Sequence, residues 1–254
     1  MGSGCWPGDS SPGQELGLGQ ELLGKSEEST IMCGRYVRLE KIEDLLKVLN
    51  AKLTSKVTGS YNIAPSQMVA CVRDAPENEH RKCTLLKWGL LPPWAKDASI
   101  GNKINARAET MAGKPSFRSA FKKRRCLVVA HGYYEWKREG KTKQPYYIRF
   151  KDHRPFAFAG LWERNEKATK EPIESCTIVT TGPNALMEPI HHRMPVILEP
   201  SDYDRWLDST VSDPITLNPI LGPYRNNEEM EAYPVSTTVN SPTNNRVECI
   251  QPLT

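Results

Sequence analysis

Apolar residues recur along the chain with two different spacings. Between residues 39 and 50, leucine and isoleucine lie three or four positions apart, which is typical of one face of a helix. Two further short helices are expected near residues 117–121 and 203–207. Elsewhere, short runs of Val, Ile, Phe and Tyr favour strands, since these side chains suit a pleated surface. The predicted strands cover residues 85–88, 125–130, 145–150, 156–162, 176–181, 195–198 and 232–239.

The predicted strands outnumber the predicted helices and do not alternate with them regularly. An α+β fold built on a curled sheet is therefore expected, rather than a doubly wound parallel sheet. The texture changes at Met32, so residues 32–254 are expected to form one domain. Residues 1–31 hold seven of the 17 glycines and no β-branched residue before Thr30, which predicts a flexible extension.

Composition and charge exclude several classes of protein. Of the 254 residues 38% are hydrophobic and 25% charged, which excludes collagen-like and wholly disordered chains. The longest apolar runs are far below the roughly 18 residues that span a bilayer, so no membrane partner is expected. Residues 1–31 carry five acids and one base, which leaves 25 acids and 33 bases on the rest of the chain. That moderately basic body suits a polyanionic partner, although many basic proteins bind none.

Cysteine and histidine usage gives no sign of a metal centre. The seven cysteines are widely scattered without a Cys-x-x-Cys pair, and the five histidines show no metal-ligand spacing. No structural zinc and no cofactor are therefore expected. Residues 1–31 also lack the basic start and hydrophobic stretch of a secretory signal, so a reducing compartment is expected.

Cys33 is the first candidate for chemistry, because it follows a methionine at the point where the body begins. A lone cysteine is most simply a buried core residue. If Cys33 were the first residue, however, it would carry a free α-amine, which titrates at roughly pH 8 and is more often unprotonated than a lysine amine. An amine and a thiol on one residue react with an aldehyde in two steps. Imine formation is followed by intramolecular addition of the thiol, which closes a thiazolidine ring.

Two further residues have acid–base character. Glu135 follows the apolar run 127–130, so it is either a solvated residue at the rim of a sheet or a carboxyl group desolvated by its aromatic neighbours. His191 lies in a predicted loop beside a second histidine, where solvated side chains are common. With Cys33 as nucleophile and His191 as base, the same residues would make a cysteine hydrolase. Spacing along the chain does not separate these alternatives.

Amides and cations gather in segments that suit contacts with nucleic acid. Residues 102–110 contain Asn105 and Arg107 among other amides and cations, and Asn62 lies in a similar segment. Turn formation is the simpler explanation of such asparagines. Arg193 is able to hold a phosphate through two parallel hydrogen bonds.

Two tryptophans, Trp88 and Trp94, enclose a proline-containing segment. Core packing is the simpler interpretation of the pair. If both were exposed, they would form a stacking platform or wedge for bases, which together with nearby cations is typical of single-strand binding.

Taken together, these segments resemble the SRAP family, the SOS-response-associated peptidases. The resemblance runs in order from Met32 to about Asn245, which is nearly the whole body. One such motif is weakly specific, whereas six in order are highly specific. The matching segments are Met-Cys-Gly-Arg at 32–35, Tyr-Asn-Ile-Ala-Pro at 61–65, Trp-Gly-Leu-Leu-Pro at 88–92, Asn-Ala-Arg-Ala-Glu-Thr at 105–110, Gly-Tyr-Tyr-Glu-Trp at 132–136 and His-His-Arg-Met-Pro at 191–195.

The resemblance implies a single compact domain with a β-rich, barrel-like mixed sheet core and peripheral helices. It also implies a protein of DNA repair that captures abasic sites in single-stranded DNA as a covalent DNA–protein crosslink. That activity is peptidase- or lyase-like and not multiple-turnover hydrolysis. The implied catalytic residues are Cys33 as aminothiol nucleophile, Glu135 and His191 as acid–base groups, and Asn62, which orients the cysteine. The implied DNA-binding residues are Arg35, Trp88, Asn105, Arg107, Trp136 and Arg193, with Asn105, Arg107 and Arg193 on phosphates and the tryptophans against nucleotides.

The chain departs from the family pattern at its start. Family members begin at the Met-Cys pair, whereas 31 residues precede it here. While the bond between Met32 and Cys33 persists, the Cys33 nitrogen is an amide and forms no imine. Three outcomes are open. Translation starts at Met32 and the methionine is removed; or the Cys33 thiol cuts its own preceding bond through a thioester; or the full-length chain is an inactive DNA binder.

Two other classes of function compete with covalent capture. A cysteine peptidase acting on other proteins would tolerate a blocked Cys33 amine, and a non-covalent single-strand binder would be indifferent to Cys33→Ala. A monomer is expected in either case. The compartment is the cytoplasm of a bacterium, favoured by the absence of a long tail after Asn245, or the nucleus of a eukaryote.

Overall fold

The computed structural model describes residues 1–2, 33–75, 77–101 and 103–253. Contacts divide the chain into residues 1–30 and a body of residues 31–254. The expected flexible extension, residues 1–31, lies almost entirely outside the described residues. Within the described ranges, every helix and strand belongs to the body.

The strands of the body form two sheets. The smaller sheet has five strands, in the order β13 (Met230–Pro234), β9 (Thr142–Phe150), β8 (Gly132–Glu139), β1 (Arg35–Arg38) and β3 (Ser60–Ile63). The larger sheet runs in the order β12 (Met194–Pro195), β11 (Ile173–Thr181), β10 (Phe156–Asn165), β7 (Arg125–Ala130), β4 (Met68–Arg73), β5 (Arg81–Trp88) and β2 (Ala51–Leu53). A short strand, β6 (Asn105–Arg107), pairs with β11.

The larger sheet closes on itself. Strand β11 pairs with β10 on one side and, in parallel, with β5 on the other, with Cys176 opposite Trp88. Strands β11, β10, β7, β4 and β5 therefore form a closed ring that contains one parallel and four antiparallel pairings. The expected α+β fold with a barrel-like mixed sheet core is confirmed.

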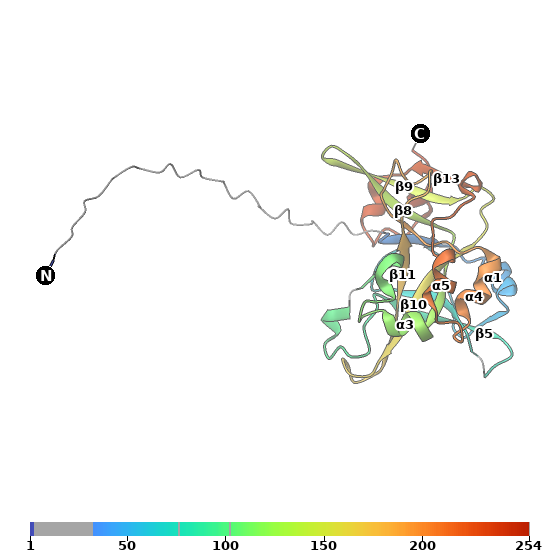
Figure 1. Ribbon diagram of the computed structural model, residues 1–254. Coiled ribbons are helices and arrows are strands. Elements are labelled where there is room, and N and C mark those ends of the chain that lie inside the picture. Colours follow the sequence, from blue (N-terminus) through green and yellow to red (C-terminus); the bar gives the residue numbers. More distant parts are fainter. Residues whose placement is uncertain (3–32, 76, 102, 254) are drawn as a thin grey trace. The chain divides into compact units, whose positions relative to one another are not determined.

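Helices in the body are short and lie outside the sheets. They are α1 (Glu43–Val48), α2 (Ala108–Met111), α3 (Arg118–Lys123), α4 (Tyr203–Leu207) and α5 (Pro214–Leu217). Short 3-10 turns occupy Ala98–Gly101, Pro200–Asp202, Asn218–Ile220, Asn227–Glu229, Thr237–Asn240 and Val247–Ile250. Figure 1 shows β8, β9 and β13 together in one layer, with α1, α3, α4 and α5 gathered around β10 and β11.

The surroundings of strand β7 explain why its sequence is apolar from Cys126 to Ala130. Leu127 and Val129 face a core cluster that the helices cover, whereas Val128 and Ala130 face a second cluster shared with the smaller sheet. Alternate residues of a strand point to opposite faces, so a strand that is buried on both faces needs apolar residues at every position. The second cluster contains Tyr36 of β1, which links the barrel to the strand that follows Cys33.

Most of the predicted elements are present, with altered ends. The predicted strand 125–130 is β7 and the predicted helix 203–207 is α4. The strands expected at 85–88, 145–150, 156–162 and 176–181 lie within the longer strands β5, β9, β10 and β11.

Three expectations about element ends need correction. The helix expected over residues 39–50 is only α1, although Leu45 and Leu46 are buried as its apolar face predicts. Strand β12 is limited to Met194–Pro195, since the following residues make only an isolated bridge from Ile197 to Phe158. Strand β13 ends at Pro234, before the turn Thr237–Asn240.

A sharp passage between the sheets positions the candidate site. Strand β7 ends at Ala130, and only His131 separates it from β8 in the other sheet. The His131 ring secures this passage by accepting a hydrogen bond from the Leu39 backbone at 3.2 Å. A β-carbon at Gly132 would lie 2.4 Å from the Tyr147 ring, so only glycine fits there. Glu135 follows three residues later and is carried into the smaller sheet beside β1.

Membrane-spanning helices and disulfides are both absent from the part of the chain that the structure describes. No helix there is long and apolar enough to cross a bilayer. Its six cysteines are all free and buried thiols, namely Cys33, Cys71, Cys83, Cys126, Cys176 and Cys249.

Candidate active site

Cys33 and His191 lie more than 150 residues apart along the chain, with Glu135 between them. The three residues meet in the fold. Strand β1 pairs with β8, which brings Cys33, two residues before β1, next to Glu135. The backbone nitrogen of Cys33 donates a hydrogen bond to Oε1 of Glu135 at 2.7 Å. Nδ1 of His191 lies 3.9 Å from the other carboxylate oxygen, Oε2. The carboxylate of Glu135 therefore stands between the cysteine and the histidine.

All three side chains are withdrawn from solvent, at 4%, 1% and 9% exposure for Cys33, Glu135 and His191. Glu135 lies buried within strand β8, so the first alternative, a solvated residue at the rim of a sheet, is wrong. Strand β8 begins two residues after the end of β7, so Glu135 is buried inside a strand. The sequence alone placed it beyond the end of a strand. The alternative expectation, a desolvated carboxyl group, describes this site.

Burial governs the acidity of the carboxyl group. It raises the pKa of Glu135 to about 7, although the hydrogen bonds that the carboxylate accepts from Cys33 act in the opposite direction. A carboxyl group that titrates near neutrality exchanges protons readily in both directions at physiological pH. Glu135 is therefore able to act as an acid in one step and as a base in another.

The two neighbouring groups are both biased toward their neutral forms. Burial raises the pKa of the Cys33 thiol well above its ordinary value, and the negative charge of Glu135 raises it further. Burial also lowers the pKa of His191, and the neighbouring His192, Arg138 and Arg193 lower it further, against a hydrogen bond with the Arg193 backbone. Nε2 of His191 is buried and has no hydrogen-bond partner among the described residues. A neutral imidazole with a free nitrogen is suited to proton transfer.

Cys33 also has an unusual backbone. Its φ of +44° lies in the left-handed region, which a residue with a β-carbon seldom adopts. Such a conformation costs of order 1–2 kcal/mol and persists where the surrounding structure holds it. The hydrogen bond to Glu135 and the start of β1 on the other side hold it here.

The residues expected to bind phosphate lie along strand β11. Strand β6 places Asn105 opposite Ile178 and Arg107 opposite Thr180 on one side of β11. On the other side β12 pairs with Thr180 and Thr181, which brings Arg193 to the same end of that strand. Arg107 is exposed and Asn105 is half-buried. The fold thus collects cationic and amide side chains at one end of β11.

Arg193 is already engaged in the structure. Nη1 and Nη2 donate to the two carboxylate oxygens of Glu109 at 2.7 and 3.0 Å, and Nη2 also donates to the Thr180 carbonyl at 2.8 Å. The pairing holds the pKa of Glu109 below its ordinary value, with Arg107 adding to the effect.

Three other predicted site residues brace the C-terminal segment instead of touching the cysteine. The Asn62 amide donates to the carbonyls of Val239, Ser241 and Asn244 at 2.8–3.1 Å, and its oxygen accepts from Arg35. Arg35 itself donates to the Val239 and Asn240 carbonyls at 2.7 and 3.0 Å. Trp136 is half-buried, and its ring nitrogen bonds the side chain of Asn240 at 2.8 Å.

Asn62 therefore reaches Cys33 only through Arg35, two residues along the chain. Each hydrogen bond that the structure describes for the Asn62 side chain goes to Arg35 or to residues 239–244. A direct contact that orients the cysteine is not among them. The hydrogen bonds of Asn62 instead hold the segment 239–244 in place.

Trp88 requires a clear correction. It is fully buried, its ring nitrogen donates to the Ile104 carbonyl at 2.9 Å, and Tyr36 packs edge-on against it at 5.5 Å. A buried ring offers no face to a nucleotide, so the expectation of base packing at Trp88 is wrong. Trp94 is instead 50% exposed. Of the two tryptophans that flank the segment, the second is the one available for stacking.

Some residues of the site were not identified from sequence. Glu109 and Thr180 hold Arg193, and His192 packs against His191 with a centroid separation of 4.4 Å. The hydroxyl of Tyr133 is buried without a hydrogen-bond partner among the described residues, and its pKa is raised by burial and by the nearby Cys33 and Glu135. Glu109, His192 and Tyr133 all lie inside the matched motifs, but only the fold shows their partners.

No group of three or more His, Cys, Asp or Glu side chains is arranged to bind a metal ion in the described ranges.

Three relatives of the chain carry the same description, abasic site processing protein. The abasic site processing protein YoqW of Bacillus subtilis is 46% identical over 226 residues, covering 87% of this chain and 99% of the relative. The abasic site processing protein YedK of Escherichia coli is 29% identical and covers 87% and 100%. The abasic site processing protein HMCES of Gallus gallus is 32% identical over 72% of this chain and 61% of the relative.

A solved structure and a family model also match the chain. A crystal structure of a protein from Bacteroides thetaiotaomicron superposes with a TM-score of 0.76 at 28% identity, covering 87% of this chain and all of the other. Residues 32–242 match the family described as SOS response associated peptidase. The chain therefore belongs to the SOS response associated peptidase (SRAP) family.

Proposed function

We propose that this protein senses abasic sites in single-stranded DNA and captures them covalently as a thiazolidine formed by Cys33. The relatives named above are abasic site processing proteins, and the resemblance covers almost all of the body. The observation that carries the chemistry is the 2.7 Å contact between the Cys33 nitrogen and a carboxyl group whose pKa is about 7.

Capture requires a free amine on Cys33, so the bond to Met32 must be absent or broken. One route is initiation at Met32 followed by removal of the methionine. The other is self-cleavage, in which the Cys33 thiol attacks the Met32 carbonyl and the C–N bond breaks as a thioester forms. Water then hydrolyses the thioester, which regenerates the thiol and releases residues 1–32 with a new carboxylate.

The geometry favours departure of the Cys33 nitrogen in that second route. The departing nitrogen needs a proton, and the nearest acid is Glu135, whose Oε1 lies 2.7 Å away. At a pKa of about 7 a large fraction of this carboxyl group is protonated near neutral pH. Cleavage would also relieve the left-handed backbone of Cys33, because φ no longer exists for a first residue.

Capture then proceeds in two bond-forming steps. An abasic deoxyribose must first open from its closed hemiacetal, which His191 and Glu135 assist by moving one proton onto the ring oxygen and another off the hydroxyl. The Cys33 amine adds to the aldehyde carbon and water leaves, which gives an imine. The thiol adds to the same carbon while its proton passes to the nitrogen, and this closes the five-membered ring. Ring closure removes the imine from which β-elimination would break the strand.

Contacts with the strand are assigned to the polar groups at the end of β11. Asn105, Arg107 and Arg193 would hold phosphates next to the lesion, and Trp136, which follows Glu135 in β8, would pack against a nucleotide. Phosphate contacts dominate affinity for nucleic acid, so the non-covalent encounter should weaken as salt concentration rises.

A conventional cysteine peptidase is the less suitable alternative. Such an enzyme needs a thiolate, and cysteines that serve as nucleophiles have lowered pKa values. Burial and Glu135 instead raise the pKa of the Cys33 thiol. The thiol of this site is better suited to adding to a reactive imine than to attacking a series of external peptide bonds.

The decisive experiment uses protein that begins at Cys33 and single-stranded DNA with one abasic site. A slow band that survives heat on a denaturing gel is expected, and it should vanish for Cys33→Ala and for protein with an acetylated α-amine. A crosslink that persists with the amine blocked would refute the proposed chemistry. Intact-mass measurement of the purified full-length chain tests the processing step, for which a species beginning at Cys33 is expected.

A further inference from the structure

The guanidinium group of Arg193 is occupied by a protein carboxylate. Glu109 accepts hydrogen bonds from both Nη1 and Nη2, at 2.7 and 3.0 Å, in a paired arrangement. The Arg193 side chain is 12% exposed, whereas that of Glu109 is 50% exposed. One partner is thus held in the protein while the other lies at the surface.

A carboxylate and a phosphate bind a guanidinium in the same way. Both accept two parallel hydrogen bonds from the planar fork, so they compete for the same position on one arginine. Arg193 has few alternatives, because Nη2 also donates to the Thr180 carbonyl at 2.8 Å. A phosphate that used this fork would have to displace Glu109.

Glu109 is placed to move aside. It lies in the first turn of the four-residue helix α2, directly after β6, and its side chain is half exposed. Its charge is also attracted by Arg107, an exposed cation at the same end of β11. The carboxylate therefore neutralises part of the cationic surface to which the phosphates are assigned.

We propose that Glu109 is a specificity-determining residue that occupies the phosphate position on Arg193 until a DNA phosphate displaces it. The inference rests on the proposed function and deepens it. Each binding event with DNA requires the ion pair between Glu109 and Arg193 to break, so undamaged strands bind weakly. Strands with an abasic site are retained nonetheless, since the covalent step makes their capture independent of that weak hold.

The test measures the affinity of the full-length chain for an undamaged single strand. Glu109→Gln keeps the size of the side chain and removes its charge, so Arg193 loses a strong competitor for phosphate. Breaking a partly exposed ion pair is worth up to about 1 kcal/mol, which corresponds to a dissociation constant roughly three- to fivefold lower. Glu109→Asp, whose shorter side chain cannot keep both hydrogen bonds, should give a smaller gain.

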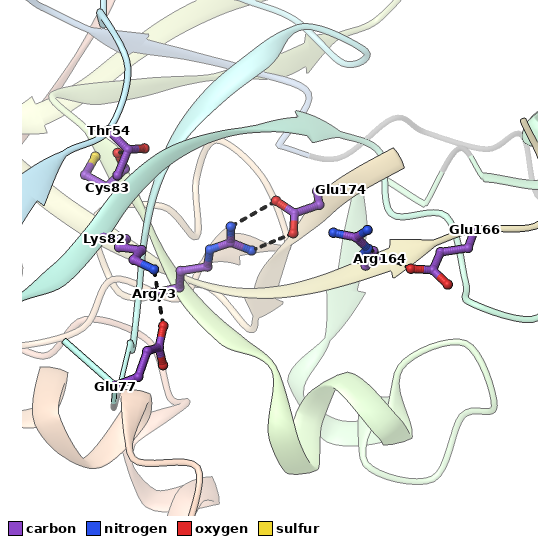
Figure 2. A network of polar contacts seen from close by, with 8 residues as sticks. All are labelled: Thr54, Arg73, Glu77, Lys82, Cys83, Arg164, Glu166 and Glu174. Atoms are coloured by element: carbon purple, nitrogen blue, oxygen red, sulfur yellow. Dashed lines mark hydrogen bonds and ion pairs between the residues drawn. The ribbon is translucent and has the colours of Figure 1, made fainter. Parts of the chain in front are cut away.

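A matched control separates this effect from the general effect of one charge. Glu174 accepts two hydrogen bonds from Arg73 at 3.0 and 2.9 Å in the same paired arrangement (Figure 2). It lies near the opposite end of β11 from Thr180, roughly 20 Å away at the usual rise of a strand. Glu174→Gln removes the same charge beyond the screening length and should leave the affinity within about 1.5-fold of the original value.

A double substitution tests whether Glu109 acts through Arg193. In an Arg193→Gln background, Glu109→Gln should no longer tighten binding, because the competition no longer exists. Thermal unfolding of each variant identifies any that fails to fold, and Glu109→Asp then serves in place of Glu109→Gln. A purely structural role for Glu109 predicts weaker binding on substitution, never tighter binding.

The inference is overturned if Glu109→Gln binds no more tightly than Glu174→Gln, if it binds more weakly, or if the gain persists without Arg193. The proposed function fails separately, when protein beginning at Cys33 gives no heat-stable band with an abasic strand. A wild-type crosslink without a gain at Glu109 would therefore refute the exchange alone.

Discussion

Replacing Glu135 with glutamine tests the electrostatics on which the site depends. The carboxyl group is 1% exposed and lies 3.9 Å from Nδ1 of His191, and burial raises its pKa to about 7. Glutamine keeps the shape and the oxygen that accepts from the Cys33 nitrogen, but it never ionises. The substitution therefore removes one property, the buried negative charge at alkaline pH.

The expected magnitude follows from the two titration points. In the unfolded chain a glutamate titrates near pH 4.3, and in the folded chain Glu135 titrates near 7. Between these values the folded state binds more protons than the unfolded state, so stability falls as pH rises. Each pH unit in this window is worth about 1.4 kcal/mol, and the loss between pH 5 and pH 8 comes to roughly 2–3 kcal/mol. Glu135→Gln should escape this loss.

The assay is urea unfolding of full-length protein at pH 5 and pH 8. The gain in stability of Glu135→Gln over the original chain should grow by roughly 2–3 kcal/mol between the two pH values. Glu163→Gln is the matched control, since Glu163 is equally buried but accepts two hydrogen bonds from Arg124 at 2.8 Å. That variant should be destabilised by about 1–3 kcal/mol at both pH values, because the arginine loses its partner.

The two variants should thus change stability in opposite directions at pH 8. An effect of Glu135→Gln that is the same at pH 5 and pH 8 would show that the carboxyl group titrates normally, and the reasoning about desolvation would be refuted. The same variant, prepared to begin at Cys33, should lose crosslinking to abasic DNA, since the group that moves protons is gone.

Three further changes test other parts of the structure. Cys33→Ser in protein that begins at this residue keeps the amine but not the thiol, so imine formation should be followed by strand cleavage, seen as shortened DNA on a denaturing gel. Gly132→Ala should destabilise the fold by about 1–3 kcal/mol in urea, because its β-carbon would overlap the Tyr147 ring, while Gly182→Ala, with open space around it, should be nearly neutral. Asn62→Ala should cost about 1–3 kcal/mol by removing the hydrogen bonds of Asn62 to Arg35 and to three carbonyls, and hydrogen exchange should rise first at residues 239–244; unchanged exchange there would contradict the bracing role.

The yield of crosslink should depend on pH through Glu135 and His191, whose pKa values shift in opposite directions. Burial raises the pKa of Glu135 to about 7 and lowers that of His191, so the two titrate in the reverse of their usual order. A protonated carboxyl group next to a neutral imidazole is the combination that both donates and accepts near neutrality.

The sequence by itself determined the class of fold and identified the candidate reacting residues. The prediction of strand 125–130 rests on the run of apolar residues 126–130, and that of helix 203–207 on the capping-box-like pair Ser201 and Asp204. Cys33, Glu135 and His191 were found through six motifs in a fixed order. Such features are local in the chain, so periodicity and motif content are sufficient to detect them.

Only the tertiary structure decided what each side chain contacts. Closure of the barrel depends on two residue pairs between β5 and β11, nearly 90 positions apart, and no local pattern encodes such a pairing. Trp88 and Trp94 have similar neighbours in sequence, yet the first lies inside the barrel and the second at the surface. Asn62 bonds a segment 177 or more residues away, and Glu109 bonds Arg193 across 84.

The physical reason is that burial and hydrogen-bond geometry belong to the folded arrangement and not to a residue type. Glu135 has an ordinary carboxyl group, and its pKa of about 7 arises only when β7 runs directly into β8 and carries it out of water. Cys33 acquires its role only when pairing of β1 with β8 sets its nitrogen against that group. The sequence identified the candidate reacting residues. The paired strands set the distances between these residues and exclude solvent from them.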